Sequence, residues 1–322
     1  MANYKKISGQ AVKCYDSDPP KAYPSAWEGQ LYYNTSDGQF KYQTLGVGAW
    51  SSGGSLNTGR KSHGSSGTQT ANLVYGGDGP SGNQAITESY NGSSWSEVAD
   101  LNTARRGNPG LGTQTATLQA GGSPTTVIVE SFDGTSWTET TDLNTGRNGG
   151  AGSVGISTAG LIFAGTPGLA VTESWNGSAW TEVADLNEGR ESVSVFGSYT
   201  SAICAGGETP QVDDVESWNG SSWTEVTDMN TNAMLRGGAG SSNSEGIVFG
   251  GSVDPPVTAN TEQWDGSSWT EVANLSTARY GPGGTSASTA SQIALASGGH
   301  PNRLTATEEW TVAHTLKKVT TS

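Results

Sequence analysis

One eight-residue phrase recurs along this chain, and it constrains the fold more than any other feature of the sequence. Its five copies are ESYNGSSW (88–95), ESFDGTSW (130–137), ESWNGSAW (173–180), ESWNGSSW (216–223) and EQWDGSSW (262–269). An arginine follows each copy, and one more precedes the first. These arginines are Arg60, Arg105, Arg147, Arg190, Arg236 and Arg279, spaced by 45, 42, 43, 46 and 43 residues. A period of this length predicts the blades of a β-propeller, each with four strands.

Each repeat carries the signals of four short strands. A pair of small residues separates each arginine from the next glutamate: Gly76-Gly77, Gly121-Gly122, Ala164-Gly165, Gly206-Gly207, Gly250-Gly251 and Gly298-Gly299. We expect the first strand to follow the arginine and the second strand to end at this pair. The third carries glutamate and an aromatic residue, and the fourth begins at tryptophan. Between the last two, Asn-Gly or Asp-Gly predicts a tight hairpin turn in which both residues take positive φ.

The ends of the array predict six blades in a closed ring. Trp50 lies ten residues before Arg60, as Trp95 lies before Arg105, so it marks a fourth strand without the preceding three. TEEWTV (307–312) is like a third strand without a fourth. Joining the two completes a sixth blade and leaves no open sheet edge where the ring meets itself. The predicted propeller covers residues 47–312.

The repeated large and charged residues are predicted to be structural. The tryptophans are Trp50, Trp95, Trp137, Trp180, Trp223, Trp269 and Trp310. A buried indole removes about 150–250 Å² from water, so we expect a core between blades rather than a sugar-stacking surface. The glutamates that recur in step with the arginines are Glu88, Glu130, Glu173, Glu216, Glu262 and Glu308. We expect them to pair with the arginines between blades, or the arginines to hold loop carbonyls; the alternative is an arginine-lined ligand mouth.

The small-residue pair, the two aromatic residues five apart and the arginine after the fourth strand resemble the kelch repeat, over residues 47–312. That family implies a scaffold for binding partners, with a few oxidases. Two departures are Ala164-Gly165 and three extra residues between Trp223 and Arg236. Residues 1–46 lack the repeat. Their segment EGQLYYNTSDGQFKYQT (28–44) predicts a hairpin around Asp37-Gly38, and it resembles short hairpin modules of bacteriophage tail-fibre and virion proteins. The alternative is a cap over one blade edge. Residues 313–322 are expected to form a C-terminal tail.

Charge and motifs argue against several classes of function. The net charge of −14 repels phosphate backbones, so we expect no nucleic-acid binding. No stretch approaches the ~20 apolar residues of a membrane span. Two cysteines are expected to be unpaired, and three histidines lack the spacing of a metal site. Asn91, Asn176 and Asn219 begin N-G-S sequons, but Asp133 and Asp265 fill the same slot, so turn formation is predicted rather than glycosylation. We therefore expect no enzyme, metal or cofactor.

Binding is predicted at the loops between the second and third strands, because these loops vary while the strands repeat. They share a face with the connections between blades. The candidate binding residues are Asp78, Asn83, Glu208, Asp213, Asp214, Asp254, His300, Asn302 and Arg303.

These features together predict a non-enzymatic phage virion protein, as a tail fibre, a spike or a head decoration. The predicted role is adhesion to a receptor or glycan on a host surface. We expect other virion proteins as partners through residues 1–46, homo-oligomers, and synthesis in the host cytoplasm without a signal peptide. A kelch-type scaffold for a protein partner and a carbohydrate-active enzyme remain as alternatives.

Overall fold

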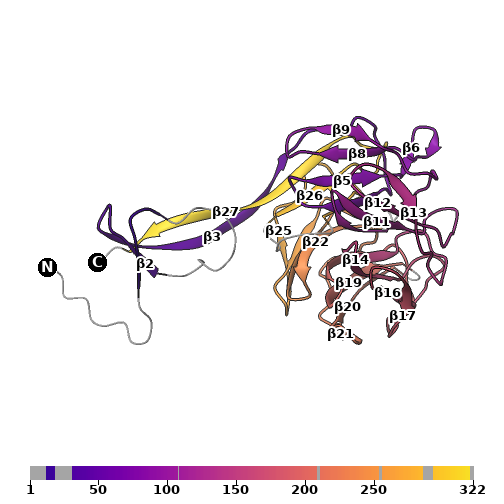
Figure 1. Ribbon diagram of the computed structural model, residues 1–322. Coiled ribbons are helices and arrows are strands. Elements are labelled where there is room, and N and C mark those ends of the chain that lie inside the picture. Colours follow the sequence, from indigo (N-terminus) through magenta and orange to yellow (C-terminus); the bar gives the residue numbers. More distant parts are fainter. Residues whose placement is uncertain are drawn as a thin grey trace. The chain divides into compact units, whose positions relative to one another are not determined.

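The computed structural model describes residues 12–18, 31–107, 109–208, 211–253, 256–285 and 293–319. Over these ranges the chain forms strands and turns, without a helix (Figure 1). The chain divides into two compact units, residues 49–311 and residues 1–48 together with 312–322. The predicted all-β fold is confirmed.

The larger unit contains five four-stranded antiparallel sheets within the described ranges, each formed by one repeat of the sequence (Figure 1). The first consists of β4 (Gly64–Gly67), β5 (Asn72–Tyr75), β8 (Thr87–Tyr90) and β9 (Trp95–Val98). The second consists of β10 (Gly110–Thr113), β11 (Ala116–Ala120), β12 (Val129–Phe132) and β13 (Trp137–Glu139). The third consists of β14 (Gly152–Ile156), β15 (Ala159–Phe163), β16 (Thr172–Trp175) and β17 (Trp180–Glu182).

The remaining two of these sheets follow the same order. The fourth consists of β18 (Ser194–Ser198), β19 (Ser201–Gly207), β20 (Val212–Trp218) and β21 (Trp223–Val226). The fifth consists of β22 (Gly237–Ser242), β23 (Glu245–Phe249), β24 (Thr261–Trp264) and β25 (Trp269–Val272). A short ribbon, β6 (Asp78–Gly79) with β7 (Gly82–Asn83), extends from the first repeat. The strand assignment predicted within a repeat is confirmed.

A further sheet joins strands from the beginning and the end of the chain. It includes β3 (Gln39–Ser52), β27 (Thr307–Lys318) and β26 (Ile293–Ser297), with β27 between the other two. The rings of Trp50 and Trp310 lie 5.5 Å apart, centroid to centroid. The strand that bears Trp50 is thus a neighbour of the strand that bears Trp310, as the sequence predicts. Residues 313–318, expected in a tail, continue β27.

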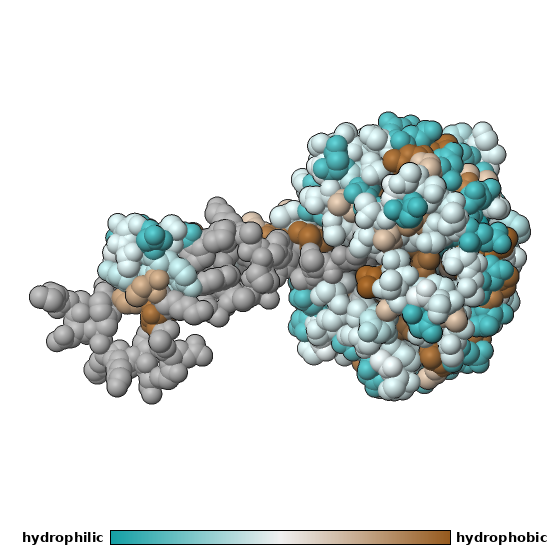
Figure 2. All heavy atoms as spheres, viewed as in Figure 1, coloured by the Kyte–Doolittle hydropathy of each residue, from teal (hydrophilic) through white to brown (hydrophobic). Residues whose placement is uncertain are grey.

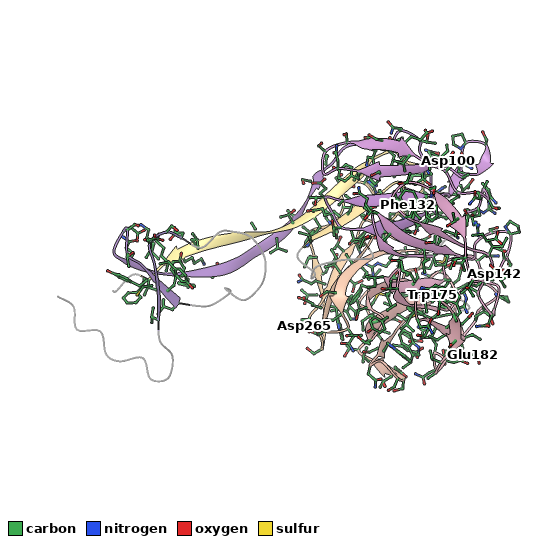
Figure 3. The ribbon with its side chains drawn as sticks, viewed as in Figure 1. Asp100, Phe132, Asp142, Trp175, Glu182 and Asp265 are labelled. Carbon is green, nitrogen blue, oxygen red and sulfur yellow. The ribbon has the colours of Figure 1, made fainter. Side chains whose placement is uncertain are left out.

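The tryptophans pack each sheet against the preceding one. Trp180 belongs to a buried cluster that contains Leu118 of the preceding sheet and Ile162. The ring of Trp223 lies 4.7 Å from the ring of Phe163 in the preceding sheet, centroid to centroid. Phe132 and Trp175 lie inside the sheets, whereas Asp265 lies at the margin of the unit (Figure 3). On the face shown in Figure 2, hydrophobic residues form only small scattered patches. The predicted aromatic core between repeats is confirmed.

The hairpin turns between the third and fourth strands differ from the prediction. Tyr90 pairs with Trp95, so four residues form the first of these turns, and Gly92 alone among them has positive φ (+90°). The side-chain Oδ1 of Asn91 accepts hydrogen bonds from the amides of Ser93 (3.0 Å) and Ser94 (2.9 Å). Because this carbonyl organises the turn, the asparagine needs no left-handed backbone. Asp133 uses its Oδ1 in the same way, which confirms that the asparagine slot forms turns.

The smaller unit contains the predicted hairpin. β2 (Leu31–Asn34) pairs antiparallel with β3, and β1 (Lys13–Tyr15) lies parallel to β2. Gly38 has φ +68° at the turn, and Tyr33 packs on Phe40. Lys41 forms an ion pair with Asp18 at 2.8 Å, which raises the pKa of the lysine.

Candidate functional site

Six buried ion pairs use the arginines and glutamates of the repeat. They are Arg60–Glu88, Arg105–Glu130, Arg147–Glu173, Arg190–Glu216, Arg236–Glu262 and Arg279–Glu308, with every side chain at most 4% exposed. Arg60 also donates from Nη1 to the carbonyl oxygens of Gly76 (3.1 Å) and Ile86 (2.6 Å). The predicted pairing of the arginines with the glutamates and the carbonyl binding are confirmed, but each arginine pairs with the glutamate of the sheet that follows it and not across two sheets. These arginines are therefore already engaged by the fold itself.

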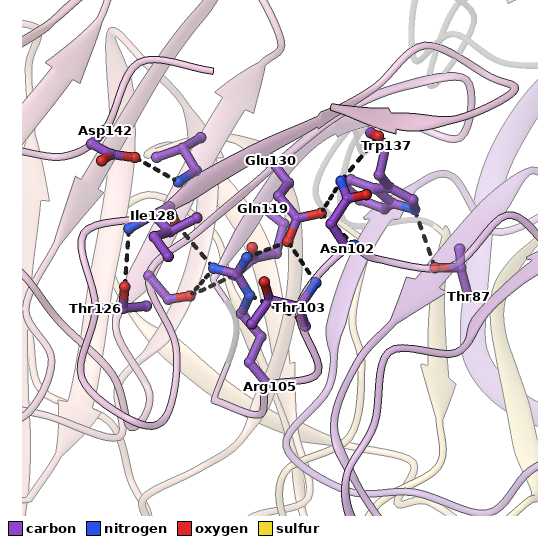
Figure 4. Close-up of polar contacts among 12 residues, drawn as sticks. Thr87, Asn102, Thr103, Arg105, Gln119, Thr126, Ile128, Glu130, Trp137 and Asp142 are labelled. Carbon is purple, nitrogen blue, oxygen red and sulfur yellow. Dashed lines mark hydrogen bonds and ion pairs between the residues drawn. The ribbon is translucent and has the colours of Figure 1, made fainter. Parts of the chain in front are cut away.

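Each glutamate also anchors the connection that precedes its sheet. Glu130 accepts hydrogen bonds from the amide (2.7 Å) and the side chain (2.9 Å) of Asn102, from the amide of Thr103 (3.3 Å) and from Arg105 (Figure 4). Sequence analysis missed this role of asparagine. The segment before the arginines could have indicated it, because asparagine stands at the same place in five of the six repeats, three times within Leu-Asn-Thr.

Arg236 reaches its glutamate from a different backbone position. Ten residues after the tryptophan of that repeat stands Ala233, and Leu235 (φ +55°) takes the left-handed conformation that Ser192 (φ +60°) has in the preceding repeat. The longer spacing from Trp223 to Arg236 is therefore not caused by an insertion in this connection. The backbone keeps its course, and an arginine three positions later donates to Glu262 at 2.6 Å.

Tryptophan side chains form a second repeated contact between sheets. Nε1 of Trp137 donates to Thr87 Oγ1 (3.2 Å) in the preceding sheet. The same pairing joins Trp50 to Thr261, Trp95 to Thr307 and Trp223 to Thr172. Where valine stands in the threonine position, at Val129 and Val215, the tryptophan donates instead to a backbone carbonyl, from Trp180 to Thr141 (3.2 Å) and from Trp269 to Thr227 (3.0 Å).

The connections between sheets and the loops after the small-residue pairs lie on the same face. Isolated β-bridges join them at Lys61–Asp78, Arg106–Ser123, Asn148–Thr166, Glu191–Glu208, Met234–Ser252 and Tyr280–His300. The predicted sharing of one face by these two sets of loops is confirmed. We call it the loop face.

Each connection has left-handed backbone at the same place, at Ser62, Gly107, Gly149, Ser192, Leu235 and Gly281, with φ between +50° and +63°, and the third connection has it at Gly150 as well. Backbone hydrogen bonds link them in sequence, from Gly107 to Ser62, Ser192 to Gly149, Leu235 to Ser192, Gly281 to Leu235 and Ser62 to Gly281. The last of these bonds joins the first repeat to the last one.

A cavity of about 380 Å³ lies among these connections, and residues of every repeat line it. His63 lines it and is buried, with Nε2 3.3 Å from Ser297 Oγ. Burial lowers the pKa of His63 to about 3, with a further contribution from nearby Arg60, so the imidazole is neutral at pH 7. Its Nδ1 has no hydrogen-bond partner among the described residues.

Three of the predicted binding residues meet where the first and last repeats adjoin. Arg303 Nη2 lies 3.2 Å and 3.3 Å from the two carboxylate oxygens of Asp78, and Lys61 Nζ lies 3.7 Å from the same carboxylate. His300 stacks on Tyr280 with centroids 4.5 Å apart, and Lys61 Nζ lies 5.6 Å from the centroid of Tyr280. We call Lys61, Asp78, Tyr280, His300 and Arg303 the seam cluster. Asn302, also predicted, precedes Arg303 in its loop.

The other predicted binding residues do not belong to this cluster. Asn83 donates to the carbonyl oxygen of Ser123 (2.8 Å), and Glu208 accepts a hydrogen bond from Ser192 (2.7 Å). Asp213 and Asp214, expected in a variable loop, lie in β20, because the strand begins at Val212 and pairs there with Gly207. Asp254 falls outside the described residues.

Within the described part of the chain, no group of three or more His, Cys, Asp or Glu side chains is arranged to hold a metal ion. None of its secondary structure is a helix long and apolar enough to cross a bilayer. Cys14 and Cys204 are free, as predicted. Comparison of the sequence with protein-family models and with curated proteins gives no match.

Proposed function

We propose that residues 49–311 form a closed, six-bladed, kelch-like propeller that serves as a binding module rather than an enzyme. The backbone bond from Ser62 to Gly281 and the contacts of Trp50 with Trp310 and Thr261 support this arrangement. With the further sheet counted as a blade, each repeat contacts the one before it, and the first contacts the last. Rigid blades then present variable loops on one face, as in other repeat scaffolds.

The seam cluster is the observation that carries a binding role. It gathers two cations, a carboxylate and two stacked rings on the loop face, whereas the repeated arginines and glutamates are used in buried pairs. Side chains with different chemistry at one place of an otherwise regular array favour recognition of a ligand.

We further propose that the chain is a phage virion protein that adheres to a host surface through the loop face. Residues 1–46 would join it to other virion proteins as a symmetric homo-oligomer. The hairpin of β2 and β3, which resembles virion hairpin modules, supports this role.

Mass spectrometry of purified phage particles tests the proposal. We expect peptides of this chain at a fixed ratio to other structural proteins, and we expect the recombinant chain to slow adsorption of the particles to host cells. If the chain is absent from particles and instead isolates with a soluble protein partner, the virion role is wrong and a kelch-type scaffold is favoured.

A further inference from the structure

The larger unit is strongly acidic, yet its few basic residues outside the six buried pairs are gathered on one face. Residues 49–311 contain nine basic and 26 acidic side chains. Six of the nine are the arginines of the buried pairs. The other three are Lys61, Arg106 and Arg303, and all of them belong to the loop face. Random placement of three cations on a unit with this charge would not favour a single face.

Two of these cations share one carboxylate in the seam cluster. Asp78 is 6% exposed; it accepts hydrogen bonds from Arg303 and forms a longer ion pair with Lys61, and these two basic side chains are 38% and 24% exposed. One positive charge therefore remains at the cluster. The contact with Asp78 uses Nη2 of Arg303 and leaves the side chain 38% exposed. A guanidinium in this state can still donate to a second anion.

The backbone that presents Arg303 is held in an unfavourable conformation. Asn302 and Arg303 both have left-handed backbone, with φ +63° and +53°. Such a conformation is unfavourable for an L-amino acid with a side chain, because Cβ comes close to the following carbonyl oxygen. Consecutive strained residues are concentrated at functional sites, where the strain positions a side chain.

Arg106 is exposed and lines the central cavity, together with hydroxyl side chains such as Ser65, Ser123 and Ser153. The volume of this cavity, about 380 Å³, lies within the range of about 300–1,000 Å³ that is typical of small-ligand sites. A ligand that suits this face carries anionic groups for the cations and hydroxyl groups for the serines.

We propose that the loop face binds an acidic saccharide, with sugar carboxylates held by Lys61 and Arg303 at the seam cluster and by Arg106 at the cavity. The inference rests on the proposed adhesive function and specifies its ligand class. The acidic remainder of the unit does not exclude such a ligand, because charges are screened beyond about 8 Å at physiological ionic strength. A sugar ring can lie against the Tyr280–His300 pair.

Calorimetric titration of the full chain with uronic-acid and sialic-acid polysaccharides, and with their carboxyl-reduced forms, tests the proposal. We expect binding that carboxyl reduction abolishes. Arg303→Gln and Arg106→Gln should each weaken it about tenfold or more, because each removes a charge-assisted hydrogen bond. Arg106 is exposed, so Arg106→Gln should keep the melting temperature, whereas Arg303→Gln should lower it slightly because Asp78 then keeps only the ion pair with Lys61. Lys318→Gln, which removes an exposed charge from the smaller unit, is the matched control.

The outcomes separate the two proposals. Equal binding of acidic and carboxyl-reduced sugars, or unchanged affinity in both arginine variants, overturns the acidic-saccharide proposal and leaves host adhesion in place. Absence of binding to every sugar also overturns it. The proposed adhesive function is overturned by a different result, namely that the chain neither occurs in particles nor slows their adsorption.

Discussion

At the scale of single residues, the buried ion pairs show how this chain tolerates charge in its core. Removing a carboxylate and a guanidinium from water is expensive unless further hydrogen bonds satisfy both groups. Glu173 accepts from the amide and side chain of Asn144, from the amide of Thr145 and from Arg147. Burial lowers the pKa of Arg147, and the nearby carboxylate partly opposes that shift. The repeat therefore supplies both the charge and the partners that charge requires.

We predict that Glu173→Gln destabilises the protein by about 3–5 kcal/mol, because it leaves Arg147 buried without a charged partner. Urea unfolding followed by tryptophan fluorescence measures the change. Glu182→Gln is the matched control, because Glu182 is directly opposite Glu173 on the neighbouring strand but exposed. This control should stay within about 0.5 kcal/mol of the parent. Similar losses in both variants would contradict a special role for the buried pair.

At the scale of strands and turns, the tryptophan that begins each fourth strand ties its sheet to the preceding one. Trp137 is 5% exposed, and its Nε1 would lack a partner in the core without Thr87. In the two repeats with valine at the position of Thr87, a backbone carbonyl accepts the hydrogen bond from the indole instead. Local replacement of the acceptor thus keeps the indole satisfied while the sheet packing is retained.

Thr87→Val should destabilise the protein by about 1–3 kcal/mol, because a buried indole N–H loses its acceptor while the volume of the side chain is nearly kept. Thr87→Ser retains the hydroxyl and should recover part of this loss. Chemical unfolding of the two variants gives the comparison. If valine is tolerated as well as serine, then Trp137 has found a carbonyl, as Trp180 does, and the threonine bond is dispensable.

The sequence predicted these elements well where one residue type decides the local structure. Glycine pairs, tryptophan starts and the Asn-Gly or Asp-Gly signal located the strands and turns of the five four-stranded sheets, except that β20 begins earlier than predicted; β1 and the ribbon of β6 and β7 were not predicted. The turn conformation itself was predicted wrongly, because the side chain of Asn91 could supply the contact that a left-handed backbone was expected to provide. Arg236 was misaligned for a related reason: spacing counts residues along the chain, but a long side chain can deliver its guanidinium from another position.

At the scale of the whole molecule, spacing predicted that the strands bearing Trp50 and Trp310 are neighbours, but not the cavity or the seam cluster. Both depend on contacts between residues about 200 positions apart, such as Arg303 with Asp78. No local pattern in the sequence marks such pairs. The order of the repeats could be predicted because each repeat carries its own sequence signals, whereas the cavity and the seam cluster form only when several repeats come together.

The proposed closure gives the last prediction. Trp50 packs against Phe249 (4.9 Å) and Trp310 (5.5 Å), centroid to centroid, and donates to Thr261, so Trp50→Ala should cost about 3–5 kcal/mol and lower the melting temperature. Val47→Ala, at a position 84% exposed on the same strand, should change little. Calorimetry of both variants distinguishes a strand that completes a sheet from one that merely lies beside it. If Trp50→Ala melts at the same temperature as Val47→Ala, β3 does not stabilise the larger unit through Trp50, and the proposed six-bladed ring loses its main support.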